Sequence, residues 1–191
     1  EGIVEIYDAG FDSQDGSPFV AMELLDGAPL RDRLAGGPVP TAQLIDWFEQ
    51  ILDPLAAAHD VGIVHRDLKP ENIFLQRKKD GTEVMKILDF GIAREMDGQK
   101  QSVTHTGIAM GTPHYMAPEC AEGGQAVRRS DVYSLACVVF EMLTGDVPHD
   151  ADTPIGVLSA KVCEPAPRLS ERSELTFSTP VEQVFADALS R

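Results

Sequence analysis

Residues 65–75 constrain the fold of this chain more than any other segment. Asp67 is followed two positions on by Lys69 and five positions on by Asn72, and an apolar run closes the segment. Pro70 cannot lie in a helix interior, so we expect a rigid loop here. A carboxylate can accept a hydroxyl proton, an ammonium can neutralise phosphoryl charge, and an amide oxygen is a hard ligand of the kind that Mg²⁺ takes. This combination suits phosphoryl transfer.

Two further motifs follow in a fixed order. An Asp-Phe-Gly triplet occupies residues 89–91, directly after an apolar run, and residues 111–119 end in Ala-Pro-Glu. A catalytic loop, here residues 65–72, a metal-binding Asp-Phe-Gly and an Ala-Pro-Glu form the signature set of protein kinases. The chain therefore resembles the eukaryotic-like (Hanks-type) serine/threonine protein kinases and is most similar to bacterial members. The resemblance implies an α+β, protein kinase-like fold with a mainly helical large lobe and two small-lobe strands.

Length and charge narrow the class of protein further. A chain of 191 residues can form one domain but is too short for a whole two-lobed kinase, so we expect a kinase domain truncated at both ends. The formal net charge of −15 disfavours nucleic acids and anionic membrane surfaces as partners, because both would be repelled. Cys120, Cys137 and Cys163 show neither metal-ligand spacing nor a paired framework, which is typical of a reducing compartment.

The sequence contains no recognisable membrane or export segment. Residues 1–4 lack the basic stretch of a secretory signal, and the longest apolar run, residues 132–142, is too short to span a bilayer and contains Glu141. We expect a cytoplasmic location, either for a free protein or for the cytoplasmic domain of a membrane-anchored kinase.

The chain divides into two unequal parts on this interpretation. Residues 1–25 are expected to hold the small-lobe strands and the hinge, and residues 26–191 the large lobe, incomplete at its C-terminal end. Apolar patterns and turn residues predict strands at 3–10, 19–23, 73–75 and 84–88, and helices at 29–34, 42–59, 131–144, from 154 onward and 181–190. Thr41 is the expected N-cap of helix 42–59 and Gly62 its left-handed stop. By the resemblance, Asp131 caps its helix and ties it to the backbone of the catalytic loop.

The resemblance also implies an ATP site at the junction of the two parts. Met22 would stand at the gatekeeper position behind the adenine. The Glu23 carbonyl and the Leu25 amide would bind the adenine edge, and Phe74 would line the nucleotide pocket. Lys69 would contact the phosphate that is transferred.

Phosphoryl transfer assigns a role to each polar residue of the motifs. Asp67 would position the substrate hydroxyl and accept its proton, while Asn72 and Asp89 would hold Mg²⁺. A lysine at position 69 is typical of serine/threonine kinases, so protein substrates with serine or threonine are expected. Thr112 would hydrogen-bond near Asp67 and Lys69.

Other residues point to regulation or to the core. Arg66 resembles the arginine that pairs with a phosphorylated activation segment, and Thr104 and Thr106 are the expected phosphosites. The alternative for these threonines is a polar loop without modification. His65 and Phe90 are expected to pack in the core rather than to act as catalytic groups.

The motifs that hold the ATP phosphates are absent from this chain. No Gly-x-Gly-x-x-Gly precedes Ile3, and neither the lysine of the family's Val-Ala-Ile-Lys motif nor its glutamate partner is present. We therefore expect the parent protein to be a protein serine/threonine kinase that uses Mg²⁺ and ATP, and this piece alone to be inactive or nearly so. Glu119 is expected to lack its usual arginine partner.

Two other functions remain open at this point. A non-catalytic kinase-like regulatory or scaffolding module would be favoured if the upstream sequence lacked the lysine. A small-molecule phosphotransferase is disfavoured, because residues 111–119, which shape a peptide-substrate platform in the family, are intact.

Overall fold

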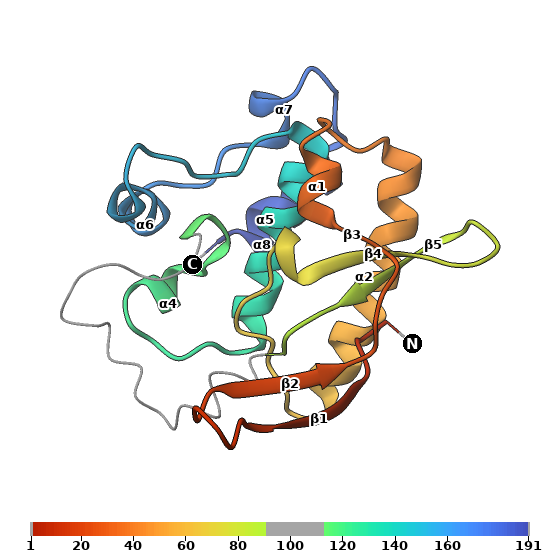
Figure 1. Ribbon diagram of the computed structural model, residues 1–191. Coiled ribbons are helices and arrows are strands. Elements are labelled where there is room, and N and C mark those ends of the chain that lie inside the picture. The colour runs from red at the N-terminus through yellow and green to blue at the C-terminus, as the bar shows by residue number, and fades with distance from the viewer. Residues whose placement is uncertain (1, 91–112, 191) are drawn as a thin grey trace.

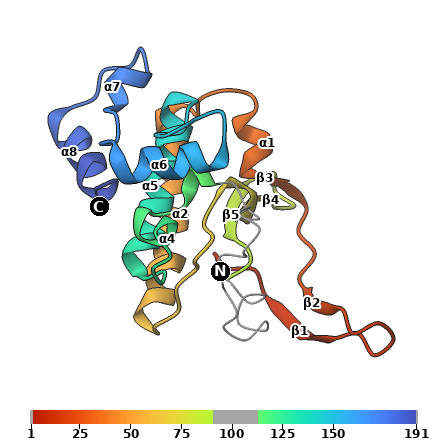
Figure 2. The same ribbon diagram turned by 90° about the vertical axis from the view of Figure 1, so that its left-hand side faces the viewer.

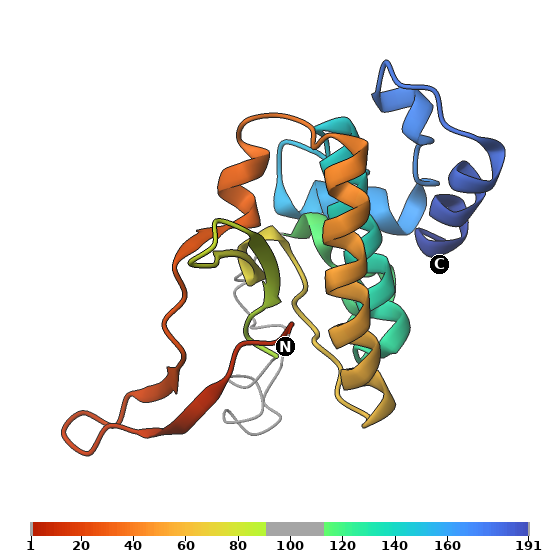
Figure 3. The ribbon, with the colours of Figure 1, turned by 90° about the vertical axis from the view of Figure 1, so that its right-hand side faces the viewer.

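The computed structural model describes residues 2–90 and 113–190, which form two antiparallel sheets and a set of helices (Figure 1). The predicted α+β fold class is confirmed. All the described strands lie in the first half of the chain, and helices α2 and α5 run side by side behind the larger sheet (Figures 1 and 3). Within these two ranges, no helix combines the length and apolarity needed to cross a bilayer.

The first two strands form a hairpin that projects away from the helices (Figure 3). β1 (Ile6–Phe11) and β2 (Pro18–Met22) pair antiparallel, and most of their side chains are exposed. Both predicted strands are confirmed. β1 begins later than expected because Ile3 instead forms a parallel bridge with Ile87, at the end of β5.

The second sheet connects the segments that carry the predicted site. β4 (Ile73–Arg77) is its central strand, flanked by β3 (Gly27–Pro29) and β5 (Glu83–Ile87). β3 follows the hinge, β4 follows the catalytic loop, and β5 leads to Asp89. Because Ile73 pairs with Ile87, the end of the catalytic loop lies beside the start of the Asp-Phe-Gly triplet.

Helix α2 (Thr41–Asp60) covers this sheet and packs against α5. Its apolar stripe follows the helical period, so one face is buried. Pro40 is the N-cap and Thr41 the first helical residue, so the predicted cap is wrong by one position. Gly62 adopts the predicted left-handed conformation, with φ of 82°, just after the helix ends.

Helix α5 (Arg128–Thr144) is buried on nearly every side, which explains why its sequence lacks a polar stripe. The predicted helix is confirmed, and Gly145 ends it with φ of 84°. The N-cap is Val127 rather than Asp131. Asp131 lies a turn inside the helix, so the predicted capping role is wrong, although its predicted link to the catalytic loop is present.

The remaining helices are shorter. α1 (Leu30–Leu34) and α6 (Pro154–Cys163) confirm their predictions, and the Thr153 side chain caps α6 by accepting from the Gly156 amide at 3.1 Å. α8 (Thr179–Ala188) begins two residues before its predicted start. α7 (Leu169–Arg172), a single turn in the polar stretch before α8, was not predicted. Figure 2 shows α7 and α8 on the side of α5 away from the β1–β2 hairpin.

Gly27 is the glycine whose replacement should cost most stability. Its φ is 149°, and a Cβ there would lie 1.9 Å from the Leu75 carbonyl oxygen, across the β3–β4 pair. Gly27→Ala must push the two strands apart, so we expect a loss of about 3 kcal/mol in unfolding free energy, measured by urea denaturation of the full-length protein. Gly81→Ala is the matched control, since its φ is 86° but its Cβ would meet open space. An equal loss of unfolding free energy in both variants would show that the close approach of β3 to Leu75 contributes nothing to that loss.

Candidate active site

The catalytic loop places three predicted side chains together. Lys69 Nζ lies 2.8 Å from Asp67 Oδ2, and the Asn72 amide nitrogen donates to the Asp67 carbonyl oxygen at 2.8 Å. The second contact of Asn72, to Asp67 Oδ2, is 3.4 Å long. The Asp67 side chain remains 39% exposed, so a hydroxyl can reach it. A short 3-10 turn, η1 (Pro70–Asn72), follows Lys69 and turns Asn72 back toward the aspartate.

Asp131 of α5 binds the backbone of the catalytic loop. Its carboxylate is 1% exposed and accepts from the His65 amide at 2.7 Å and from the Arg66 amide at 2.9 Å. His59 of α2 lies 2.7 Å away through Nε2. Arg66 has φ of 71°, a left-handed conformation that costs a non-glycine residue about 1–2 kcal/mol. These two hydrogen bonds offset that cost and fix the peptide immediately before Asp67.

His65 connects the loop to the Asp-Phe-Gly triplet. Nε2 donates to the Leu88 carbonyl at 2.7 Å, Nδ1 accepts from the Asp67 amide at 3.3 Å, and the ring contacts Phe90 with centroids 4.8 Å apart. Burial lowers the pKa of His65, which favours the neutral ring that this pair of contacts requires. The predicted core positions of His65 and Phe90 agree with these contacts. Asp89, next to Leu88, has φ of 52° and an exposed side chain.

The donor set fits a divalent cation. Asn72 uses its amide nitrogen within the loop, so among the described residues its amide oxygen has no hydrogen-bond partner, and Asp89 is an exposed residue with a carboxylate. Residues 2–90 and 113–190 contain no cluster of three acidic, histidine or cysteine side chains that could hold a metal alone. A Mg²⁺ ion here would therefore depend on these two side chains together with phosphate oxygens.

The predicted hinge has one backbone donor and one backbone acceptor that bind no described residue. Among the residues that the structure describes, the Glu23 carbonyl and the Leu25 amide have no hydrogen-bond partner, as an adenine edge would require. The Glu23 carboxylate pairs with buried Lys86, whose hydrogen bond lowers the pKa of Glu23. Phe74 of β4 is half-buried, whereas Met22 is 37% exposed.

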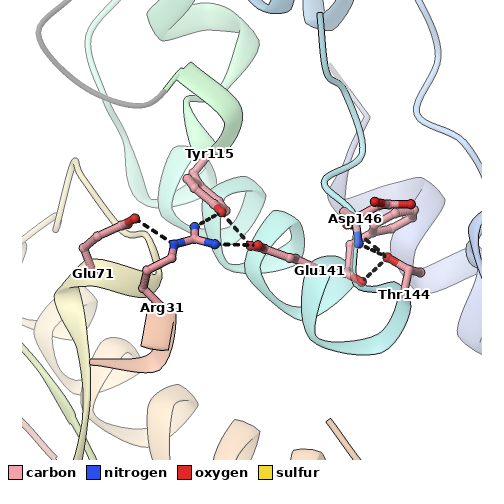
Figure 4. Close-up of polar contacts among 7 residues, drawn as sticks. Arg31, Glu71, Tyr115, Glu141, Thr144 and Asp146 are labelled. Carbon is pink, nitrogen blue, oxygen red and sulfur yellow. Dashed lines mark hydrogen bonds and ion pairs between the residues drawn. The ribbon is translucent and has the colours of Figure 1, made fainter. Parts of the chain in front are cut away.

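A second polar cluster, which sequence reasoning missed, joins four elements around Arg31 (Figure 4). The Arg31 guanidinium donates to Glu71 at 2.9 Å, to Glu141 of α5 at 2.6 Å and to the Tyr115 hydroxyl. The Tyr115 hydroxyl in turn donates to Glu141, and burial raises the pKa of that tyrosine. The available signal was Glu141 itself, because a carboxylate inside an apolar helix must have a partner. We call these four residues the Arg31 cluster.

The structure leaves part of the prediction untested. Thr104, Thr106 and Thr112 lie outside the described residues, so their predicted roles stay predictions. Arg66 is placed by its backbone beside Asp67. Glu119 was expected to lack its usual arginine partner; among the described residues, its carboxylate accepts a hydrogen bond from the Ser130 hydroxyl instead.

The fold and the ordered motifs define a class of protein, and sequence comparison agrees with it. The chain belongs to the protein kinase family, since the family model described as "Protein kinase domain" matches residues 1–188. The predicted resemblance is confirmed.

Relatives among bacterial proteins are similar along the whole chain. Serine/threonine-protein kinase Pkn1 of Myxococcus xanthus is 40% identical over 191 residues, which is 100% of this chain and 27% of that protein. Serine/threonine-protein kinase pkn3 of the same organism is 34% identical, over 98% of this chain and 35% of its own length. Serine/threonine-protein kinase PknB of Mycobacterium leprae is 39% identical, over 99% of this chain and 30% of its own length. The chain thus spans about a third or less of these relatives.

Proposed function

We propose that the protein containing this chain is a serine/threonine protein kinase, which transfers the γ-phosphoryl group of Mg·ATP to protein hydroxyls. The observation that supports this best is the catalytic loop, where the exposed Asp67 carboxylate lies 2.8 Å from the Lys69 ammonium. A carboxylate that faces solvent beside a fixed cation can accept a proton where negative charge moves.

Each loop residue has a role in this reaction. Asp67 orients the substrate hydroxyl and accepts its proton, and Lys69 neutralises charge on the phosphoryl group as it passes. Asn72 and Asp89 are the residues that would hold Mg²⁺, which supplies charge neutralisation across the phosphates. The hydrogen bonds of Asp131 and His65 hold these groups in fixed positions, so the loop need not reorganise during transfer.

In this proposal, the hinge residues bind the nucleotide. The Glu23 carbonyl and the Leu25 amide bind the adenine edge, and Met22 and Phe74 line the pocket. Residues 1–25 then belong to the small lobe and residues 26–191 to the large lobe, with the protein working in the cytoplasm on protein substrates.

Activation by phosphorylation completes the proposal. Thr104 and Thr106 become phosphorylated, and Arg66, fixed next to Asp67, pairs with the added phosphate. Thr112 then hydrogen-bonds near Asp67 and Lys69. Phosphosite mapping of the active full-length protein should find at least one of the two threonines modified, and two unmodified threonines would contradict the mechanism.

Phosphate transfer from radiolabelled ATP tests the main proposal. The full-length protein is incubated with Mg²⁺ and a mixture of peptides that differ in carrying serine, threonine or tyrosine, with a metal-chelated sample as control. We expect label on serine or threonine that disappears on chelation. Nucleotide binding without transfer to any peptide would instead indicate a non-catalytic kinase-like module.

A further inference from the structure

Lys161 is a buried lysine that the proposed reaction does not use. It lies on α6 and is 2% exposed. Its Nζ donates to the His114 carbonyl oxygen at 2.6 Å and to the Tyr133 hydroxyl at 3.3 Å, and it lies 3.9 Å from Cys137 Sγ. An ammonium group carries three N–H donors, and these three atoms offer one acceptor to each.

These contacts offset the large free-energy cost of burying the Lys161 ammonium group. Lysine is almost never fully buried without a partner of opposite charge, and here the partners are a carbonyl, a hydroxyl and a thiol. Burial lowers the pKa of Lys161 and raises the pKa of Cys137 to about 11, so the thiol is neutral at physiological pH. The Tyr133 ring, 4.8 Å from Nζ, gives a cation–π contact. The shortest contact, to the His114 carbonyl, joins α6 to residues 113–115, whereas Tyr133 and Cys137 join it to α5.

The His114 carbonyl that Lys161 binds belongs to the segment that ends in Ala-Pro-Glu. His114 lies in η2 (Pro113–Tyr115), within residues 111–119. The His114 ring is 2.9 Å from Asp150, and the next carbonyl, that of Tyr115, accepts from Ser134 of α5 at 2.7 Å. Lys161 and Ser134 therefore fix two successive peptide units from two different helices.

The same turn is connected to the catalytic loop. Tyr115 binds Arg31 and Glu141, and Arg31 binds Glu71 beside Asn72 (Figure 4). Hydrogen bonds on either side of the covalent His114–Tyr115 link therefore connect α6 through η2 to the loop that carries Asp67.

We propose that Lys161 is a positioning residue, which fixes the substrate-binding segment at His114 and so sets how a protein substrate lies against Asp67. The inference rests on the proposed kinase function and adds a residue to it. Lys161 does not touch substrate or nucleotide; it acts through the His114 peptide.

The test compares Lys161→Met with the unchanged protein, because methionine keeps much of the buried volume but donates no hydrogen bond. In the full-length kinase, we expect KM for a peptide substrate to rise about tenfold and KM for ATP to change less than about twofold. The reason is that the lost hydrogen bond fixes the substrate-binding segment and not the nucleotide site. Amide hydrogen exchange across residues 113–117 should accelerate by about tenfold, while exchange in α2 stays unchanged. Lys79→Met, on the exposed β4–β5 turn, is the control and should alter none of these values.

The outcomes separate this proposal from the general one. An active parent in which Lys161→Met leaves both peptide KM and exchange at 113–117 unchanged would overturn the positioning role. An inactive parent would overturn the proposed function, and the exchange experiment would still decide whether Lys161 fixes the segment. If Lys161→Met does not fold, Lys161→Gln is used, because its shorter polar side chain suits the same surroundings but cannot reach the His114 carbonyl. It should show the same tenfold changes, and their absence would again overturn the proposal.

Discussion

Asp67→Asn should lower kcat for phosphate transfer by about 10³-fold, because the variant keeps the shape of the side chain but cannot accept the hydroxyl proton. The carboxylate is also the partner of Lys69 at 2.8 Å, so the cation loses its fixed position at the same time. The measurement is the rate of peptide phosphorylation at saturating Mg·ATP in the full-length protein. KM for ATP should stay within about threefold, since no hinge contact changes.

A matched substitution on an exposed site controls for general effects. Asp53→Asn changes the same atoms on the exposed face of α2, away from the loop, and should retain full activity. An Asp67→Asn variant that kept more than about a tenth of the rate would exclude Asp67 as the proton acceptor.

Asp131→Ala should be among the most destabilising single substitutions in the described chain. The change removes the acceptor of two backbone amides and of the His59 contact, in surroundings that water does not reach. Leaving buried polar groups without partners is expected to cost roughly 3–5 kcal/mol of unfolding free energy. Urea denaturation of the full-length protein, followed by a probe of the kinase domain, measures this loss.

Asp53→Ala is the control for this second substitution. An exposed helical position tolerates alanine well, so its unfolding free energy should change by less than about 0.5 kcal/mol. If Asp131→Ala were as mild, the hydrogen bonds to His65 and Arg66 could not be what holds the catalytic loop in place.

Local sequence rules predicted the catalytic side of the molecule well. Pro70 predicted a rigid loop rather than a helical turn, and this was wrong for residues 70–72, which form the 3-10 turn η1 with Pro70 at its first position. The apolar runs beside it gave β4 and β5 close to their observed ends. The errors at helix starts are of one kind. Thr41 and Asp131 are good capping residues, but each lies inside its helix, and the caps are Pro40 and Val127.

Contacts between distant residues could not be predicted in this way. Arg31 and Glu141 are far apart in sequence, and their pairing depends on how α1 meets α5. Lys161 looked like an ordinary helix residue, since nothing in its neighbours indicates that α6 would bury it against the His114 carbonyl. A charged residue within an apolar run, Glu141, was the one available signal, and it indicated the Arg31 cluster only.

The left-handed conformations of Arg66 and Asp89 bear on how the protein behaves when warmed. Each stores backbone strain, and each is kept in place by hydrogen bonds from distant elements rather than by its own preference. Local opening releases that strain, so the loop should melt at a smaller free-energy cost than the helices around it.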